Sequence, residues 1–211
     1  MSGEGGRMRA GCRAVVVAWL AVAMLLAGCA TAPEPLPPEL ARRPEWRVGD
    51  RWVLVRTSAA GVVRVVTNEV VDVTADGYLM RISGLGPSMT RWWTKDLHVV
   101  SQAVGERPLN RFEPAARYFA WPLVLAAEWR QEFEYRDGRH DGRYVNHWRV
   151  AERMEPVTVL LGSLPAVRID QLDDRRQPLA TYWYAPAVRF WAKFQSYNDG
   201  YVEELMEFTS G

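Results

Sequence analysis

Turn-forming residues interrupt this chain about every 8–15 residues from Gly49 onward, and this spacing limits the fold more than any other feature. Asp76-Gly77 and Asp199-Gly200 are pairs typical of tight hairpins. The runs between such turns are rich in valine and aromatic residues, which favour pleated strands over helices. This layout predicts many short strands, each joined to the next by a turn.

The stretch 128–136 indicates how these strands face the core. Trp129, Phe133 and Tyr135 lie on one side of it, and charged residues alternate with them on the other. Such alternation favours antiparallel pairing with one face covered. We expect a mainly β protein, with a single domain at 45–211 of about ten antiparallel strands and little helix. A sheet of this size must curl or close, so we expect a strongly curved sheet or an incomplete barrel.

Two parts of the domain depart from the strand pattern. Residues 104–125 contain three prolines and no period of two, so we expect a long loop or crossover, with one helical turn at residues 114–118, that lies against the sheet or across one end. Its apolar side chains Phe119 and Trp121 should pack onto the sheet near Trp129. Further on, we expect Tyr144–Arg153 and Val157–Leu161 to be separate strands.

The first 28 residues have the layout of a secretory signal peptide. Basic residues precede an apolar run, Ala14–Leu26, and the run is shorter than the roughly 20 residues that span a membrane. The start at Met1 places Glu4 in the basic region, whereas a start at Met8 would give a cleaner signal.

The end of this segment, Leu26-Ala27-Gly28-Cys29, resembles the bacterial lipobox. The resemblance implies that the Cys29 thiol carries a lipid and that cleavage occurs before it. The domains would then be a signal peptide at 1–28, a lipidated Cys29 with a proline-rich tether at 29–44, and the β-rich domain at 45–211. Ala30 follows the cysteine, which in this class of signals implies the outer membrane, facing the periplasm.

Cysteine and charge counts exclude several classes of protein. Cys12 and Cys29 are the only cysteines in the sequence, so the domain holds neither a disulfide nor a thiol nucleophile and depends on its apolar core. Without residues 1–28 the chain has 23 basic and 24 acidic residues, which leaves no basic excess for binding nucleic acid.

Three aromatic motifs carry a second resemblance. The domain begins with W-x-V-G-D-x-W at 46–52, continues with an F-x-x-P-L…W block at 119–129, and later has Y-W-Y-x-P at 182–186. Together these resemble a group of uncharacterised bacterial envelope proteins, although the glycine usual after the last motif is replaced near Arg189. The resemblance implies a β-rich, half-barrel-like fold of unknown function. The architecture is also similar to that of lipoprotein carriers, an analogy of fold alone.

No constellation in the sequence predicts catalysis or a cofactor. His140, Asp141 and His147 match no known spacing of metal ligands, so we interpret them as solvated and expect no metal site. No serine lies in a G-x-S-x-G elbow. The carboxylate pairs, such as Asp173-Asp174, look like solvated charges rather than an acid and base across a cleft.

The remaining signal is the wealth of aromatic residues. Rings on both faces of a strand can form a two-sided core, or they can line a pocket. For the pocket we expect Phe119, Trp121, Trp129 and Trp183 to contact a hydrophobic ligand or an acyl chain. We therefore expect a non-enzymatic envelope lipoprotein, attached to the membrane by its lipid, that binds such a ligand in a concave sheet. The alternative is a structural lipoprotein that joins an envelope complex through an edge strand or aromatic patch; a deep cavity would favour the first function and an exposed patch the second.

Overall fold

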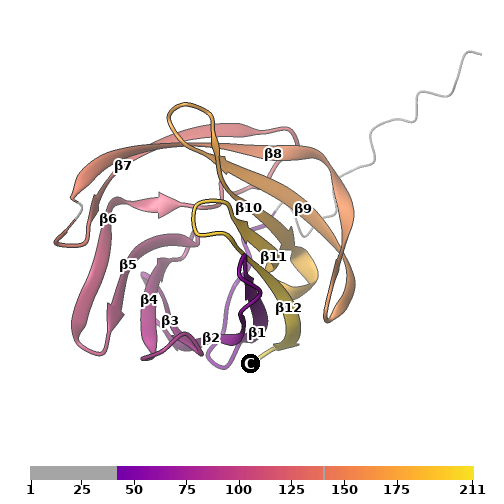
Figure 1. Ribbon diagram of the computed structural model, residues 1–211, viewed down its shortest axis with the longest axis horizontal. Helices are drawn as coiled ribbons and strands as arrows, with labels where there is room; N and C mark the ends of the chain where they lie inside the picture. The colour runs from indigo at the N-terminus through magenta and orange to yellow at the C-terminus, as the bar shows by residue number, and fades with distance from the viewer. Residues whose placement is uncertain (1–41, 140) are drawn as a thin grey trace, which may run out of the picture. The chain divides into compact units, whose positions relative to one another are not determined.

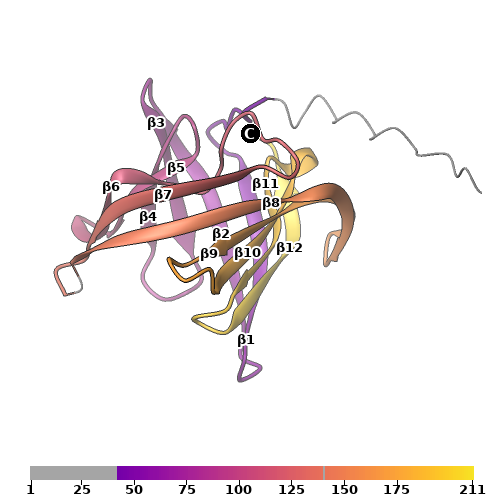
Figure 2. The ribbon, with the colours of Figure 1, turned by 90° about the horizontal axis from the view of Figure 1, so that it is seen from above.

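The valine-rich and aromatic runs form a closed barrel of twelve antiparallel strands (Figures 1 and 2). The computed structural model describes residues 42–139 and 141–211. Each strand pairs with its neighbours along the chain, and β12 pairs with β1 to close the barrel. The strands are β1 (Arg51–Ser58), β2 (Val63–Val73), β3 (Gly77–Ser83), β4 (Met89–Thr94), β5 (His98–Val104), β6 (Arg107–Arg117), β7 (Glu128–Arg136), β8 (Gly142–Val159), β9 (Gly162–Leu172), β10 (Pro178–Ala185), β11 (Phe190–Ser196) and β12 (Tyr201–Thr209). Between β10 and β11 lies one helical turn, η2 (Pro186–Val188).

The mainly β prediction is confirmed, but the predicted strand number and the open form are wrong. The chain forms twelve strands, not about ten, and the barrel is closed, not a curved sheet or an incomplete barrel. Closure satisfies the backbone groups of β1 and β12, which an open sheet would expose as edges. β1 pairs with β12 over Arg51–Ser58, so this seam is as continuous as the hairpins.

The largest correction concerns residues 104–125, which we expected to be a loop or crossover with one helical turn at residues 114–118. Residues 107–117 form β6 instead. In the pairing with β5, the register jumps between Val99 and Ser101, so residues 112–115 are left out of the ladder. Pro114 lies in this bulge, where its missing N–H removes no ladder bond. The bulge erased the period of two by which the sequence shows a strand.

A second bulge joins two runs that we expected to be separate. β8 continues through 142–159, and its register against β9 shifts between Val150 and Met154. The extra residues there bend the strand without ending it. The predicted break at residues 154–156 is therefore paired strand, which directly follows the bulge at residues 151–153.

Several sequence predictions fall outside the described residues. These are the signal peptide, the lipidated Cys29, the tether up to residue 41 and the possible metal ligand His140. In the part of the chain that the structure describes, no helix has the length and apolar character needed to cross a membrane.

Trp46 closes one end of the barrel. Its side chain is 2% exposed, and its ring lies 5.3–5.7 Å from the rings of four residues: Trp52, Tyr78, Trp93 and Phe190. Both tryptophans of the opening motif donate hydrogen bonds to the η2 turn, from Trp46 Nε1 to Arg189 O at 3.0 Å and from Trp52 Nε1 to Val188 O at 2.7 Å. The motif thus fastens the start of the domain to the turn before β11.

Arg189 follows this turn, close to where the motif resemblance leads us to expect a glycine. Arg189 has φ 56°, in the left-handed region that glycine adopts without strain. Its Nη2 donates to Oδ1 of Asp50 at 2.7 Å, and the Asp50 side chain is fully buried. Asp50 also accepts the backbone N–H groups of Arg47 at 2.8 Å and Gly211 at 2.9 Å. One buried carboxylate therefore joins both ends of the domain to the strained turn.

Candidate functional site

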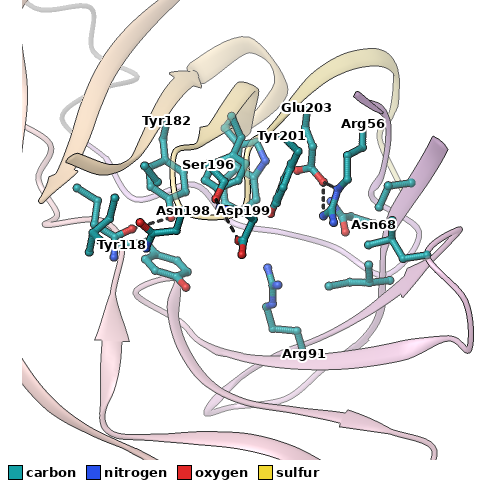
Figure 3. Close-up of a pocket in the computed structure, with 18 of the residues that line it drawn as sticks. Arg56, Asn68, Arg91, Tyr118, Tyr182, Ser196, Asn198, Asp199, Tyr201 and Glu203 are labelled. Carbon is teal, nitrogen blue, oxygen red and sulfur yellow. Dashed lines mark hydrogen bonds and ion pairs between the residues drawn. The ribbon is translucent and has the colours of Figure 1, made fainter. Parts of the chain in front are cut away.

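The interior of the barrel is not filled along its whole length. A cavity of about 280 Å³ lies at the end away from Trp46, where the β3–β4 and β11–β12 turns contribute Leu85, Asn198 and Asp199 (Figure 3). Asn198 and Asp199 are exposed, so the cavity reaches the surface there. Its other lining residues are Arg56, Val66, Asn68, Ile82, Met89, Arg91, Tyr118, Gln171, Leu179, Ala180, Tyr182, Trp191, Phe194, Ser196, Tyr201 and Glu203.

Aromatic rings form one wall of the cavity and continue toward the end of the barrel that Trp46 closes. Tyr118 lies 5.9 Å from Trp93 and 5.7 Å from Tyr182, measured between ring centroids. Tyr182 lies 4.8 Å from Phe194, which lies 5.5 Å from Tyr201. Such edge and tilted contacts fix the rings in place, so this wall is preformed.

A buried ion pair lies beside this aromatic wall. Arg56 on β1 donates from Nε at 2.8 Å and from Nη2 at 2.6 Å to Oε1 of Glu203 on β12, whose side chain is 6% exposed. The guanidinium of Arg56 also lies 4.0 Å from the centre of the Tyr201 ring. The pair spans the closing seam of the barrel, so the charge of each partner is compensated by the other.

Two further side-chain hydrogen bonds hold polar groups in the cavity lining. Tyr182 donates to Oε1 of Gln171 at 3.0 Å, and Ser196 donates to Oδ2 of Asp199 at 3.1 Å. Burial raises the pKa of Tyr182 well above its ordinary value. Burial, together with the charge of Glu203, raises the pKa of Tyr201 to about 12, although Arg56 opposes the rise. Both phenols are therefore protonated near neutral pH and act as hydrogen-bond donors.

Arg91 on β4 is the second arginine of the lining, and its guanidinium points into the cavity (Figure 3). It is held by Gln102, the residue directly opposite it on β5. The side-chain amide of Gln102 is oriented with its oxygen toward the guanidinium, because only then can it accept the N–H groups of Arg91. The oxygen lies 2.6 Å from Nη2 and 2.7 Å from Nε. The partner of this cation is therefore a neutral amide and not a carboxylate.

The four ligand-binding residues predicted from the sequence lie elsewhere. Phe119 and Trp121 stack at 5.6 Å and pack against Tyr184 of β10, which confirms that they lie on the sheet. Trp129 stacks on Trp148 at 5.6 Å, and Trp183 donates from Nε1 to Oε1 of Glu155 at 3.1 Å. None of the four lines the cavity, so we take the cavity residues as candidate ligand contacts.

Sequence reasoning missed Arg56 and Arg91. Both lie inside runs that the turn spacing predicts to be strands, 51–57 and 89–95. Arg56 is four residues from the buried Trp52, and Arg91 is two residues from the buried Trp93. Residues with this spacing share a face of a strand, so both arginines were recognisable as inward-pointing charges. Among the described residues, no cluster of three or more His, Cys, Asp or Glu side chains is arranged to hold a metal ion.

Comparison with known proteins gives structural similarities alone. No family model matches the chain, and no curated protein matches its sequence. A proposed exported protein with a YmcC-like fold from Bacteroides fragilis is 10% identical, covering 81% of this chain and 100% of its own, with a TM-score of 0.46. The hypothetical lipoprotein YmcC from Escherichia coli is 8% identical over 95% of this chain and 98% of its own, with a TM-score of 0.38. A proposed lipoprotein from Parabacteroides distasonis is 13% identical over 77% and 96%, with a TM-score of 0.36.

Proposed function

We propose that this chain is a non-enzymatic lipoprotein of the bacterial cell envelope, anchored through Cys29 at the outer membrane, and that it binds a small ligand inside the barrel. The observation that supports binding is the cavity of about 280 Å³, which is open at one end and lined by fixed aromatic rings. The lipobox-like sequence before Cys29 supports the location. The ligand is taken up at the end of the barrel away from Trp46.

The size and chemistry of the cavity favour a small ligand over a long acyl chain. The cavity volume of about 280 Å³ lies just below the roughly 300–1,000 Å³ range of pockets that hold drug-sized ligands, so a compact molecule suits it better than a long chain. Charged and amide side chains also line the cavity. A purely hydrocarbon ligand would displace the water around these side chains without offering them hydrogen bonds, which is costly. A ring-shaped ligand with polar substituents satisfies both parts of the wall.

The state of the polar groups supports binding rather than acid–base catalysis. Glu203 is held by Arg56, Asp199 accepts a bond from Ser196, and Tyr201 has a pKa of about 12. A general acid or base works best with a pKa near the working pH. Tyr201 is therefore placed to hold a ligand by donating a hydrogen bond, and both carboxylates are engaged by side chains of the barrel.

A different feature favours the second function, that of a structural subunit. Val62, Val63 and Val65 are 49–61% exposed at the tip and along the outer side of the β1–β2 hairpin, which projects from the barrel in Figure 2. Leu160 and Leu161 are 58% and 43% exposed at the β8–β9 turn. Exposed apolar groups of this kind suit contact with another protein.

Methyl NMR on the lipid-free chain (residues 30–211) tests the binding function. Met89 and Ile82 line the cavity, whereas Met206 is 39% exposed outside it and serves as the reference methyl. We expect benzyl alcohol to shift the methyl signals of Met89 and Ile82 but not that of Met206. Ala180→Met, which fills the cavity, should weaken this binding at least tenfold, while Val65→Met on the outer surface should not change it.

Two results would contradict the proposal in different ways. If palmitate shifts the cavity methyls and benzyl alcohol does not, the ligand is an acyl chain and our estimate of its size is wrong. If neither compound shifts them, the cavity does not bind ligands, and the structural function becomes the better account. Capture of a partner that is lost on Val63→Asp would then support that second function.

A further inference from the structure

We infer that Arg91 forms an anion-binding subsite in the cavity, which takes the carboxylate or phosphate group of a small ligand whose ring packs on the tyrosine wall. This inference rests on the proposed binding function and adds the chemical class of the ligand. It follows from three observations: how Arg91 is held, which charges face it, and what surrounds its free N–H groups.

A ladder of neutral amides holds the guanidinium in place. Arg91 on β4 lies opposite Gln102 on β5, and Gln102 lies opposite Asn110 on β6. The Gln102 oxygen accepts from Nη2 and Nε of Arg91, and its nitrogen lies 3.0 Å from the side chain of Asn110. The guanidinium also lies 5.5 Å from the centre of the Trp93 ring. These contacts fix the position of the cation without neutralising it.

The carboxylates near the cavity are already engaged or lie at its mouth. Across residues 42–139 and 141–211, no carboxylate lies within ion-pair distance of Arg91. Glu203 is paired with Arg56, and Asp199 lies on the exposed β11–β12 turn, where Ser196 donates to it. The inner wall therefore carries one uncompensated positive charge, which is costly in a half-buried position unless an anion joins it.

The free donors of Arg91 face the ligand space. A guanidinium has five N–H groups, and Gln102 accepts from two of its nitrogens, so about three N–H groups remain. These match the two oxygens of a carboxylate or the oxygens of a phosphate, which arginine binds in a bidentate manner. Tyr118, Tyr201 and Asp199 face the same part of the cavity as the guanidinium in Figure 3, so a ring attached to the anion would pack against the tyrosines and displace the exposed Asp199 side chain toward solvent.

Three ring compounds of matched size test the charge preference. Benzoate, phenyl phosphate and benzyl alcohol all approach the size that the cavity admits, and their binding is followed by the methyl signals of Met89 and Ile82. We expect at least one of the two anions to bind about tenfold more tightly than the neutral alcohol. The better of the two identifies the ligand group as a carboxylate or as a phosphate.

Two variants assign the preference to Arg91. Arg91→Gln should remove the advantage of the anions and leave the affinity for benzyl alcohol unchanged, whereas Arg91→Lys should keep part of it. The control is Arg81→Gln, because Arg81 lies on the outer face of the adjacent strand β3, 52% exposed and 3.5 Å from Glu69. It should not change any of the affinities.

The outcomes separate this inference from the proposed function. If the alcohol binds as tightly as the anions, and Arg91→Gln changes nothing, the cavity binds ligands but Arg91 is no anion subsite. Benzylammonium, a cation of similar size, is measured beside these three compounds; if it binds most tightly, Asp199 and Glu203 dominate the cavity and the sign of the charge is opposite to our inference. If none of the compounds binds, the proposed function itself is wrong.

Discussion

Arg189 provides a strong test of what stabilises the plugged end of the barrel. The backbone at Arg189 has φ 56°, in the left-handed region that glycine adopts without strain. Judged from the backbone alone, Arg189→Gly should be nearly neutral. The relief of left-handed strain, about 1 kcal/mol, is offset by the roughly 0.5–1 kcal/mol that the flexibility of glycine costs.

The side chain of Arg189 changes this estimate. Without it, the fully buried carboxylate of Asp50 keeps its two backbone N–H donors but loses its only described cation. Removing one partner of a buried pair costs about 3–5 kcal/mol. We therefore expect Arg189→Gly to lower the free energy of unfolding by about 3–5 kcal/mol, measured by urea denaturation of the lipid-free chain with tryptophan fluorescence.

A double-mutant cycle isolates the charge. In Asp50→Asn with Arg189→Gly no charge remains to be buried, and the amide oxygen still accepts a backbone N–H. We expect the double variant to be more stable than Arg189→Gly alone by about 2 kcal/mol. The reasoning is refuted if Arg189→Gly is neutral or stabilising, or if the two substitutions are simply additive.

Three further predictions concern other parts of the chain. Cys29→Ala should abolish incorporation of labelled fatty acid, since the thiol is the predicted attachment atom, and label on this variant would exclude the lipoprotein hypothesis. The side chain of Gln131 on β7 donates to Ala115 O on β6 at 2.7 Å, beyond the residues where the two strands pair. Gln131→Glu removes this donor and should lower the free energy of unfolding in urea by about 1–3 kcal/mol. An unchanged midpoint would show that the amide does not hold β6 and β7 together. Burial lowers the pKa of His98, so the unfolded chain takes up a proton before the folded one does. The free energy of unfolding should therefore fall below about pH 6.5, by at most about 1.4 kcal/mol per pH unit, and His98→Gln should remove this part of the slope between pH 5 and 7.

Local patterns in the sequence predicted the elements well where turn chemistry and alternation agree. Trp129, Phe133 and Tyr135 alternate with charged residues, and they lie on strand β7 as expected. The pattern failed where bulges break the alternation, at Pro114 in β6 and before Met154 in β8. The residues of these bulges lie outside the ladder, so the period of two is interrupted there and resembles the end of a strand.

The candidate site was harder to predict, because it depends on contacts between distant strands. The sequence signalled aromatic residues, and Phe119 and Trp121 do pack on the sheet. The cavity instead lies where side chains from several strands leave the interior of the barrel unfilled, and no local sequence pattern predicts such a gap. Closure was missed for a similar reason, since the pairing of β1 with β12 leaves no signature in either strand.

The seam between β1 and β12 also determines when the site comes into existence. Arg56 and Glu203 are separated by 147 residues, the most distant pair in the cavity wall, whereas each hairpin joins neighbours along the chain. Local hairpins form early in folding, and contacts of large sequence separation form slowly because closing a long loop costs entropy. The last strand must therefore reach the first before the cavity exists. A ligand that binds only the closed barrel would slow its reopening, so occupancy should appear as slower hydrogen exchange along β1 and β12.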